Sequence, residues 1–152
     1  MEKLIEVRWH GRGGQGAVTA SKLLATSALA EDKYIQAFPE YGPERMGAPI
    51  QSFTRISKIP INIHCHVINP SIVVVLDSTL LKVVDVIEGL TEDGVLIINT
   101  EESAAKIRKK LNLKGRKIYT VDASKIAQET IGRPLPNTPL IGALIKVTGL
   151  LT

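Results

Sequence analysis

The residues best suited to chemistry stand in a glycine-rich stretch near the start of the chain. The segment VRWHGRGGQGAV runs from Val7 to Val18 and holds Gly11, Gly13 and Gly16 in the spacing G-x-G-x-x-G. Apolar segments flank it, so the pattern predicts a turn from a strand into a helix. Bare backbone lets an anion approach closely, and the N–H groups of a helix N-terminus point toward it. The stretch predicts a phosphate-binding loop. The alternative is a tight turn in which glycine only avoids clashes.

Polar side chains of the same stretch would add to this anion site. Arg12, and with it Arg8, can donate charge-assisted hydrogen bonds, while Gln15 offers an amide. Gly14 completes the bare part of the loop. His10 stands at the mouth of the loop, where its simplest role is to satisfy backbone groups. The candidate site is therefore both basic and rich in backbone donors.

A dinucleotide site is the main alternative for this motif. A nicotinamide or flavin site needs an acid at the end of the second strand, about 20 residues further on, to bind a ribose. Glu40 is the nearby candidate, but it follows Pro39, beyond the expected strand end. A stand-alone NAD(P)- or FAD-binding module remains an alternative, although the sequence offers no well-placed acid for it. A P-loop is excluded because Ala17 and Val18 follow the last glycine.

Histidine and cysteine offer little further chemistry. We favour a solvent-facing or core-edge position for His64 and His66 over a metal site, because no second cysteine joins them. Cys65 is the only cysteine in the sequence. The chain therefore forms no intrachain disulfide and cannot by itself hold a cysteine-ligated iron–sulfur cluster. A reducing, cytoplasmic setting is expected.

Alternating strand and helix patterns would position these residues. Strands are expected over residues 4–9, 34–38, 95–98 and 117–121, and helices over 17–30, 101–111 and 123–131. The run SIVVVLD is typical of a central strand buried on both faces. Residues 50–56 and 61–67 would pair as an antiparallel hairpin across SKIP. The sequence predicts an α/β fold of three layers, α/β/α, with a mostly parallel sheet and this hairpin inserted.

Residues at the helix ends support these boundaries. Thr100 and Asp122 are expected to be N-caps, and Gly115 and Gly132 follow two helices where positive φ is needed. Asn137 would cap a last helix, NTPLIGALIKVTGLL, which is apolar almost all round. A helix bordering solvent is not expected to be so apolar, so a partner, or sequence beyond this chain, would cover it.

The composition indicates a single soluble domain over residues 1–152, with a net charge of +4 from 19 Lys and Arg against 15 Asp and Glu. The basic cluster at 106 and 108–110 is most simply the solvated side of a helix, so no nucleic-acid partner is expected. The apolar stretch from Leu140 to Leu151 is interrupted by Lys146 and is too short to span a bilayer. The first residues, MEKLIEVRW, lack the uninterrupted apolar core expected of a signal peptide. No membrane partner is expected.

Five motifs identify a family. RWHGRGGQG, FPEYGPERMGAP, FTRIS, VVVLD and NTPLIGAL, in this order, resemble the gamma subunits of the 2-oxoacid:ferredoxin oxidoreductases, above all those of pyruvate:ferredoxin oxidoreductase, or pyruvate synthase. The resemblance covers essentially the whole chain. Trp9, His10 and Arg12, with GPERMGAP, are similar to the pyruvate or branched-chain type rather than the 2-oxoglutarate type, although Met46 stands where an arginine is common.

The resemblance implies the reaction and the partners. Pyruvate and CoA would give acetyl-CoA and CO2, with reduction of ferredoxin or flavodoxin. Thiamine diphosphate, Mg and the 4Fe–4S clusters would belong to alpha, beta and delta subunits, and this chain would be a gamma subunit with no catalytic residue. A branched-chain 2-oxoacid oxidoreductase is the alternative complex. Family members also continue past the terminal helix, so a short or truncated version is expected.

The resemblance also implies a role for this chain. The loop from Gly11 to Gly16 would meet the phosphates of coenzyme A in a site shared with other subunits. Arg45, from the second motif, would supply a cation, and Asn137 a polar contact. The alternative for the second motif is a rigid subunit-contact loop, with Arg45 paired to an acid on another chain. A purely structural assembly subunit is the corresponding alternative for the whole protein.

Overall fold

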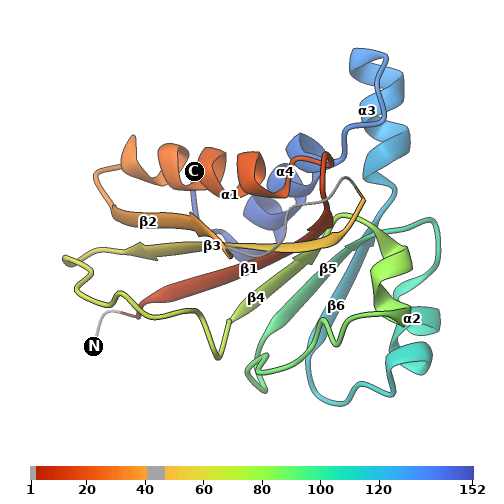
Figure 1. Cartoon of the computed structure of the whole chain (residues 1–152), viewed down its shortest axis with the longest axis horizontal. Helices are drawn as coiled ribbons and strands as arrows, with labels where there is room; N and C mark the ends of the chain where they lie inside the picture. The colour runs from red at the N-terminus through yellow and green to blue at the C-terminus, as the bar shows by residue number, and fades with distance from the viewer. Residues whose placement is uncertain (1–2, 41–46) are drawn as a thin grey trace.

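The computed structural model describes residues 3–40 and 47–152, in which strands and helices form a layered α/β structure (Figure 1). In chain order the elements are β1 (Ile5–Arg12), α1 (Ala17–Leu29), β2 (Tyr34–Pro39), β3 (Pro49–Ser57), β4 (Ile72–Val75), the 3₁₀ helix η1 (Ser78–Lys82), β5 (Val95–Asn99), α2 (Ala104–Leu111), β6 (Lys117–Val121), α3 (Ala123–Ile131) and α4 (Asn137–Thr148). The strands and helices predicted from the sequence are found at nearly these positions, apart from the hairpin.

Within the described residues, six strands form one sheet in the order β2-β3-β1-β4-β5-β6. β3 runs antiparallel to both of its neighbours, whereas β1, β4, β5 and β6 are mutually parallel. The register places Trp9 of β1 between Ser52 of β3 and Val74 of β4. The predicted α/β class with a mostly parallel sheet and an antiparallel insertion is confirmed.

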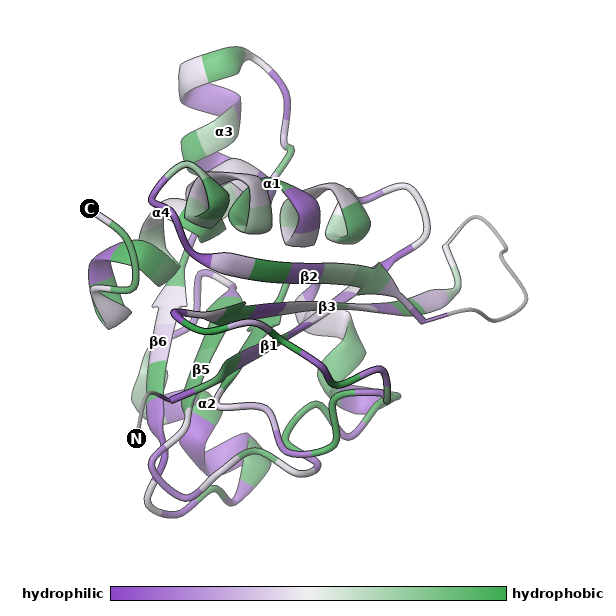
Figure 2. Ribbon diagram, turned by 90° about the vertical axis from the view of Figure 1, so that its left-hand side faces the viewer, coloured by the Kyte–Doolittle hydropathy of each residue, from purple (hydrophilic) through white to green (hydrophobic). Residues whose placement is uncertain are grey.

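Two layers of helix and loop cover the sheet. One core, which includes Trp9, Leu24 and Leu140, lies between the sheet and helices α1 and α4. A second core, which includes Leu80, Leu96 and Ile107, lies on the opposite face under η1 and α2. Figures 1 and 2 show α1 and α4 on one side of the sheet and α2 on the other, while α3 stands away from the body. Burial on both faces explains why β4 is an unbroken aliphatic run.

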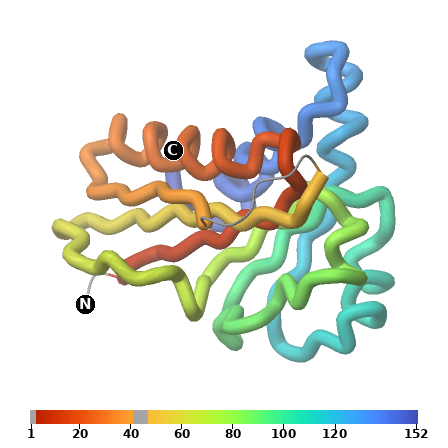
Figure 3. The backbone as a smooth tube through the Cα atoms, viewed as in Figure 1, coloured from red at the N-terminus to blue at the C-terminus, as the bar shows by residue number. Residues whose placement is uncertain are grey.

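The predicted hairpin partner of β3 is wrong. Residues 61–67 form no strand, and β3 pairs instead with β2 and β1. Both edges of β3 are occupied, so no edge remains for this segment. Side chains of the sheet bind two carbonyls of this segment. Gln36 donates to the carbonyl of Ile63 at 2.8 Å, and Arg55 donates to the carbonyl of Cys65 at 2.6 Å. The segment thus lies over the sheet as an irregular loop, visible in yellow-green in Figure 3.

The predicted helix ends are partly right. Asp122 is the N-cap of α3, since its side chain accepts from the N–H of Lys125, and Gly132 ends α3 in a left-handed conformation. α2 begins later than expected, with Ser103 rather than Thr100 as its N-cap. The left-handed residue that ends α2 is Asn112, while Gly115, at φ +81°, belongs to the turn before β6.

One side of helix α4 packs on this chain itself. Leu140, Ile141 and Leu144 are buried, and α4 contacts α1, α3 and β5. Of the helices in the described part of the chain, none combines the length and the apolar character needed to cross a bilayer.

Candidate functional site

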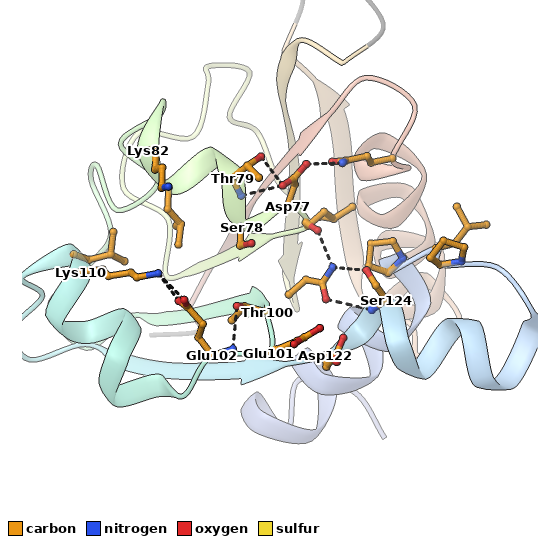
Figure 4. Close-up of a pocket in the computed structure, with 18 of the residues that line it drawn as sticks. Asp77, Ser78, Thr79, Lys82, Thr100, Glu101, Glu102, Lys110, Asp122 and Ser124 are labelled. Atoms are coloured by element: carbon orange, nitrogen blue, oxygen red, sulfur yellow. Dashed lines mark hydrogen bonds and ion pairs between the residues drawn. The ribbon is translucent and has the colours of Figure 1, made fainter.

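The candidate site lies at the carboxyl edge of the parallel strands. After β1 the chain crosses to β2 on one side of the sheet, and after β4 it crosses to β5 on the other side. Ligands of open α/β sheets bind where neighbouring strands diverge in this way. A cavity of about 980 Å³ opens there (Figure 4). Its wall includes residues that directly follow β4, β5 and β6: Asp77, Ser78, Thr100, Glu101, Asp122 and Ser124.

The glycine motif is split between the strand and the turn. Gly11 and Arg12 are the last residues of β1, so the strand extends further than the sequence predicted. A Cβ at Gly11 would lie 3.1 Å from the Cβ of Ala17, which shows how closely the strand approaches α1. The N–H of Gly13 is bound by the carbonyl of Ala48 at 2.9 Å. The turn that faces the cavity is thus short, and its lining residues are Gly14 and Gln15.

Gly16 and Asn137 meet across the loop. Gly16 has φ +88°, and a Cβ added there would come within 2.9 Å of the Asn137 Nδ2 atom. Asn137 opens α4 and directly follows Pro134, Leu135 and Pro136, which line the cavity. Asn137 does not cap α4 as expected, because its Oδ1 accepts only from the neighbouring N–H of Thr138. Two residues far apart in the sequence are brought together at the cavity mouth.

Arg12 is held beside the cavity by two segments of the chain, residues 77–79 and Gly47. Its Nε lies 3.3 Å from the Asp77 Oδ2, and its Nε and Nη2 donate to the Thr79 hydroxyl at 3.2 and 3.0 Å. Its Nη1 donates to the carbonyl of Gly47 at 3.0 Å. The Arg12 side chain is 27% exposed, so the cation is fixed in place and still accessible to solvent. Partly exposed hydrogen bonds of this kind can be exchanged for those of an anionic ligand.

Asp77 is a site residue that the sequence analysis missed. Its carboxylate accepts from the Gln15 Nε2 at 2.7 Å and from the N–H and hydroxyl of Thr79 at 2.9 and 2.6 Å (Figure 4). Burial alone would raise the pKa of Asp77, but these hydrogen bonds and the charge of Arg12 together lower it. The available signal was an acid placed directly after the buried run VVVL, where the carboxyl end of a parallel strand reaches the site.

Arg8 and His10 lie beneath the site rather than in it. Arg8 is buried and donates to the carbonyls of Val86 and Glu88 at 2.9 and 2.6 Å, and to the His10 Nε2 at 2.9 Å. Burial first, and then the charge of Arg8, lowers the pKa of His10 to about 3. The neutral imidazole thus serves as an acceptor for Arg8. The expectations that Arg8 reaches an anion and that His10 satisfies loop backbone groups are both wrong.

The remaining candidates contribute less to this site. Arg45 lies outside the described residues. His64 and His66 are exposed, and no group of three or more His, Cys, Asp or Glu side chains that could hold a metal is found in residues 3–40 and 47–152. Glu40 follows β2, and β3 separates β2 from β1. Two strand spacings of about 4.8 Å each therefore lie between Glu40 and the glycine motif, too far for the ribose acid of a dinucleotide site.

The far rim of the cavity is polar and more acidic. Glu102 accepts from Lys110 at 2.6 Å and lies 3.4 Å from the Lys106 Nζ, and Lys82 stands nearby at the rim. Figure 4 shows Glu102 and Lys110 on the side opposite Asp77 and Thr79. The hydroxyls, amides and carboxylates of this wall suit a neutral, hydrogen-bonding ligand group, whereas an anionic group is favoured at Arg12.

A glycine turn at the switch point of a mostly parallel sheet, with a polar cavity beside it, defines an α/β protein with a candidate ligand site. Comparison with known proteins specifies the class. Residues 6–152 match the model of the family described as pyruvate ferredoxin/flavodoxin oxidoreductase. The chain belongs to this family, as a subunit of the gamma type.

Relatives and solved structures agree. The chain is 54% identical over 147 residues to the pyruvate/ketoisovalerate oxidoreductases common subunit gamma of Pyrococcus abyssi, covering 97% of this chain and 80% of that protein. It is 52% identical over 149 residues to the pyruvate synthase subunit PorC of Thermotoga maritima, covering 98% and 77%. The crystal structure of pyruvate oxidoreductase subunit PORC from Thermotoga maritima matches with a TM-score of 0.87 at 50% identity, over 99% of this chain and 79% of that one.

Proposed function

We propose that this chain is the gamma subunit of a pyruvate:ferredoxin oxidoreductase, and that it helps to bind coenzyme A and to assemble the complex. The complex would convert pyruvate and CoA to acetyl-CoA and CO2 while it reduces ferredoxin or flavodoxin. One set of contacts supports the proposal for this chain: Gly14 and Gln15 of the glycine turn line the cavity of about 980 Å³ at the switch point of the sheet, Arg12 pairs with Asp77 of the cavity wall, and Asn137 lies against Gly16.

The role of the chain would be to position a ligand. The backbone at Gly14 lets a phosphate approach closely, and Arg12 supplies the charge. The polar wall of the cavity would accept the uncharged part of the molecule. Holding a reactant in the correct orientation lowers a barrier by several kcal/mol without any chemical group from the positioning domain. The thiol of CoA would then be presented to chemistry that takes place in another subunit.

The hard chemistry would belong to partner chains. Thiamine diphosphate with Mg, and the 4Fe–4S clusters, would be held by alpha, beta and delta subunits. Cys65 is the one cysteine of this sequence and is exposed, so a cysteine-ligated cluster cannot form within this chain. We place the complex in the cytoplasm, where thiols stay reduced.

A second candidate is a subunit shared with a branched-chain 2-oxoacid oxidoreductase. The Pyrococcus abyssi relative is named as common to pyruvate and ketoisovalerate oxidoreductases. A subunit that positions CoA would fit either reaction, because the two share that substrate and differ in the oxoacid. A stand-alone dinucleotide-binding module is disfavoured, because β3 separates Glu40 from the glycine motif.

The first test is an anaerobic pull-down of the tagged chain from its native extract, with the eluate assayed for viologen reduction. We expect partner chains that contain iron, and activity that requires CoA together with pyruvate. Activity with ketoisovalerate as well would favour the shared subunit. Recovery of the chain alone, with a bound nicotinamide or flavin nucleotide, would contradict the proposal.

The second test separates CoA binding from assembly. In the assembled complex, Arg12→Ala is expected to raise the KM for CoA about tenfold, as for the loss of one charge-assisted hydrogen bond. Arg133→Ala is the matched control, since it removes the same charge from an exposed position in the connection to α4. If Arg12→Ala instead reduces partner recovery and leaves the KM for CoA unchanged, the chain is an assembly subunit only.

A further inference from the structure

We propose that Asp77 is the positioning residue of this site: it holds Arg12 and Gln15 in the arrangement that receives the ligand's phosphate. This inference rests on the proposed function and adds to it a residue outside the glycine motif. Asp77 follows β4 and caps η1, on the other side of the strand divergence from the glycine turn. A group in this place can fix the two sides of the crevice relative to each other.

The two carboxylate oxygens of Asp77 have different partners. Oδ1 accepts from the N–H of Thr79 at 2.9 Å and from its hydroxyl at 2.6 Å, so it caps η1. Oδ2 accepts from the Gln15 Nε2 at 2.7 Å and lies 3.3 Å from the Arg12 Nε. Because one oxygen is anchored to η1, the position of the other is fixed. It therefore acts as a rigid acceptor for the glycine turn.

Gln15 transmits this constraint to the end of β1. Its Nε2 is directed to Asp77, which turns its Oε1 toward the N–H of Arg12, where it accepts at 2.7 Å. The guanidinium of Arg12 is held at the same time by the Thr79 hydroxyl and the carbonyl of Gly47. The backbone and the side chain of Arg12 are thus both oriented through contacts that Asp77 organises.

The arrangement needs a carboxylate and not its isosteric amide. In Asp77→Asn the Oδ1 would still cap η1, because Asn and Asp are equally good N-caps. The Nδ2 group would then face the Gln15 Nε2 and the Arg12 Nε, so that donors would stand against donors. The variant therefore removes only the contacts toward the glycine turn and keeps the local fold.

The test measures Asp77→Asn in the assembled complex. We expect the KM for CoA to rise about fivefold to tenfold, as for the loss of a charge-assisted hydrogen bond, with kcat and the KM for the oxoacid changed less than about twofold. Asp85→Asn is the matched control: like Asp77, Asp85 accepts from the N–H two residues further on, that of Ile87 at 3.3 Å, but Asp85 is exposed and does not line the cavity. It is expected to leave the KM for CoA unchanged.

The double variant Arg12→Ala/Asp77→Asn tests whether Asp77 acts through Arg12. We expect a KM for CoA no higher than that of Arg12→Ala alone. The positioning role is overturned if the increases in the KM for CoA of the two single variants multiply in the double variant. It is also overturned if the two aspartate variants change this KM equally, or if Asp77→Asn lowers it. If Arg12→Ala raises the KM and Asp77→Asn does not, this inference fails while the proposed function stands. If Arg12→Ala leaves the KM for CoA unchanged, the CoA-binding part of the proposed function fails.

Discussion

The antiparallel half of the sheet, β2, β3 and β1, and the parallel half, β4, β5 and β6, bury opposite kinds of side chain on the same face. In the antiparallel half this face carries buried Arg8, His10 and Arg55 together with the buried aromatic ring of Phe53. In the parallel half the same face carries aliphatic side chains, among them Val73 and Leu96. Val73 pairs directly with Arg8 of β1. The two halves of one sheet are therefore stabilised by different forces.

The difference follows from what covers each half. The parallel half lies under η1 and α2, whose apolar side chains bury the aliphatic strands. Over the antiparallel half the chain forms loops, and loops present unpaired backbone carbonyls. Arg55 donates to the carbonyl of Cys65, and Arg8 donates to those of Val86 and Glu88. Buried arginines thus fix loops where a helix would otherwise pack, and they do so with directional bonds.

The largest expected effect comes from removing one of these arginines. Arg55→Met would leave Glu6, the Gln36 side chain and the carbonyl of Cys65 without their common donor. Breaking a buried ion pair on one side costs about 3–5 kcal/mol of unfolding free energy. Urea denaturation of the purified chain would measure the loss. Hydrogen exchange is expected to show it first in β2, β3 and the loop at 58–67.

Leu96→Ala is the matched variant in the parallel half. It removes a fully buried aliphatic side chain and is expected to cost about 2–5 kcal/mol. Because hydrophobic packing has no direction, protection against exchange should fall across the whole sheet. The contrast between the halves is wrong if Arg55→Met also lowers protection evenly in β4, β5 and β6.

The second prediction concerns pH. The pKa of His10 is lowered to about 3 by burial and by Arg8, so between pH 6.5 and 3 the unfolded chain binds a proton that the folded chain does not. Stability is therefore lost as the pH falls through this window, by about 1.4 kcal/mol per pH unit. Asp77, whose pKa is also lowered, adds a loss of the same sign only below its usual range near pH 4. The test should stay above pH 4.

His10→Gln is the variant that isolates this effect. A glutamine oxygen can accept from Arg8 roughly where the His10 Nε2 does, but it does not titrate. The dependence of the unfolding free energy on pH between 6.5 and 4 should largely disappear. His64→Gln, at an exposed position, should keep the wild-type slope. An unchanged slope in His10→Gln would show that the buried polar layer does not set the acid stability.

The contrast between the halves also explains what the sequence could predict. The run SIVVVLD predicted a strand buried on both faces, and β4 is buried throughout, since composition alone fixes this outcome. Residues 61–67 alternate as a strand does, yet alternation does not specify a pairing partner, and β3 is already paired on both edges. The sequence suggested that Arg8 binds an anion, because its true acceptors cannot be recognised locally. They are backbone carbonyls 78 and 80 residues away.

The candidate site shows the same limit. The glycine spacing predicted the turn, but the pairing of Arg12 with Pro49 extends β1 into the motif, and that pairing is set by β3. Asp77 follows β4, so its link to Gln15 depends on the order of the strands. The structure of the parallel half can be predicted from local sequence pattern. The positions of the residues that join the two halves cannot, because they depend on contacts between residues far apart in the sequence.

The smallest predicted effect compares two left-handed glycines. Gly16 joins the antiparallel half to the site, and Gly132 ends α3, which follows the last parallel strand. Both have positive φ, +88° and +73°, so alanine at either position costs about 1–2 kcal/mol of backbone strain. At Gly132 nothing lies within 4 Å of the added Cβ, whereas at Gly16 it would meet the Asn137 Nδ2 at 2.9 Å.

The difference between Gly16→Ala and Gly132→Ala therefore isolates the contact between the glycine loop and α4. Thermal unfolding should show a slightly larger loss for Gly16→Ala, because Asn137 must shift to make room. Adding Asn137→Ala should remove this excess and bring the two glycine variants to the same stability. Only Gly16→Ala should change the KM for CoA, because only this variant displaces a residue, Asn137, that lies beside the glycine turn. Equal KM values for CoA in the two glycine variants would mean that the approach of α4 to the loop serves stability alone.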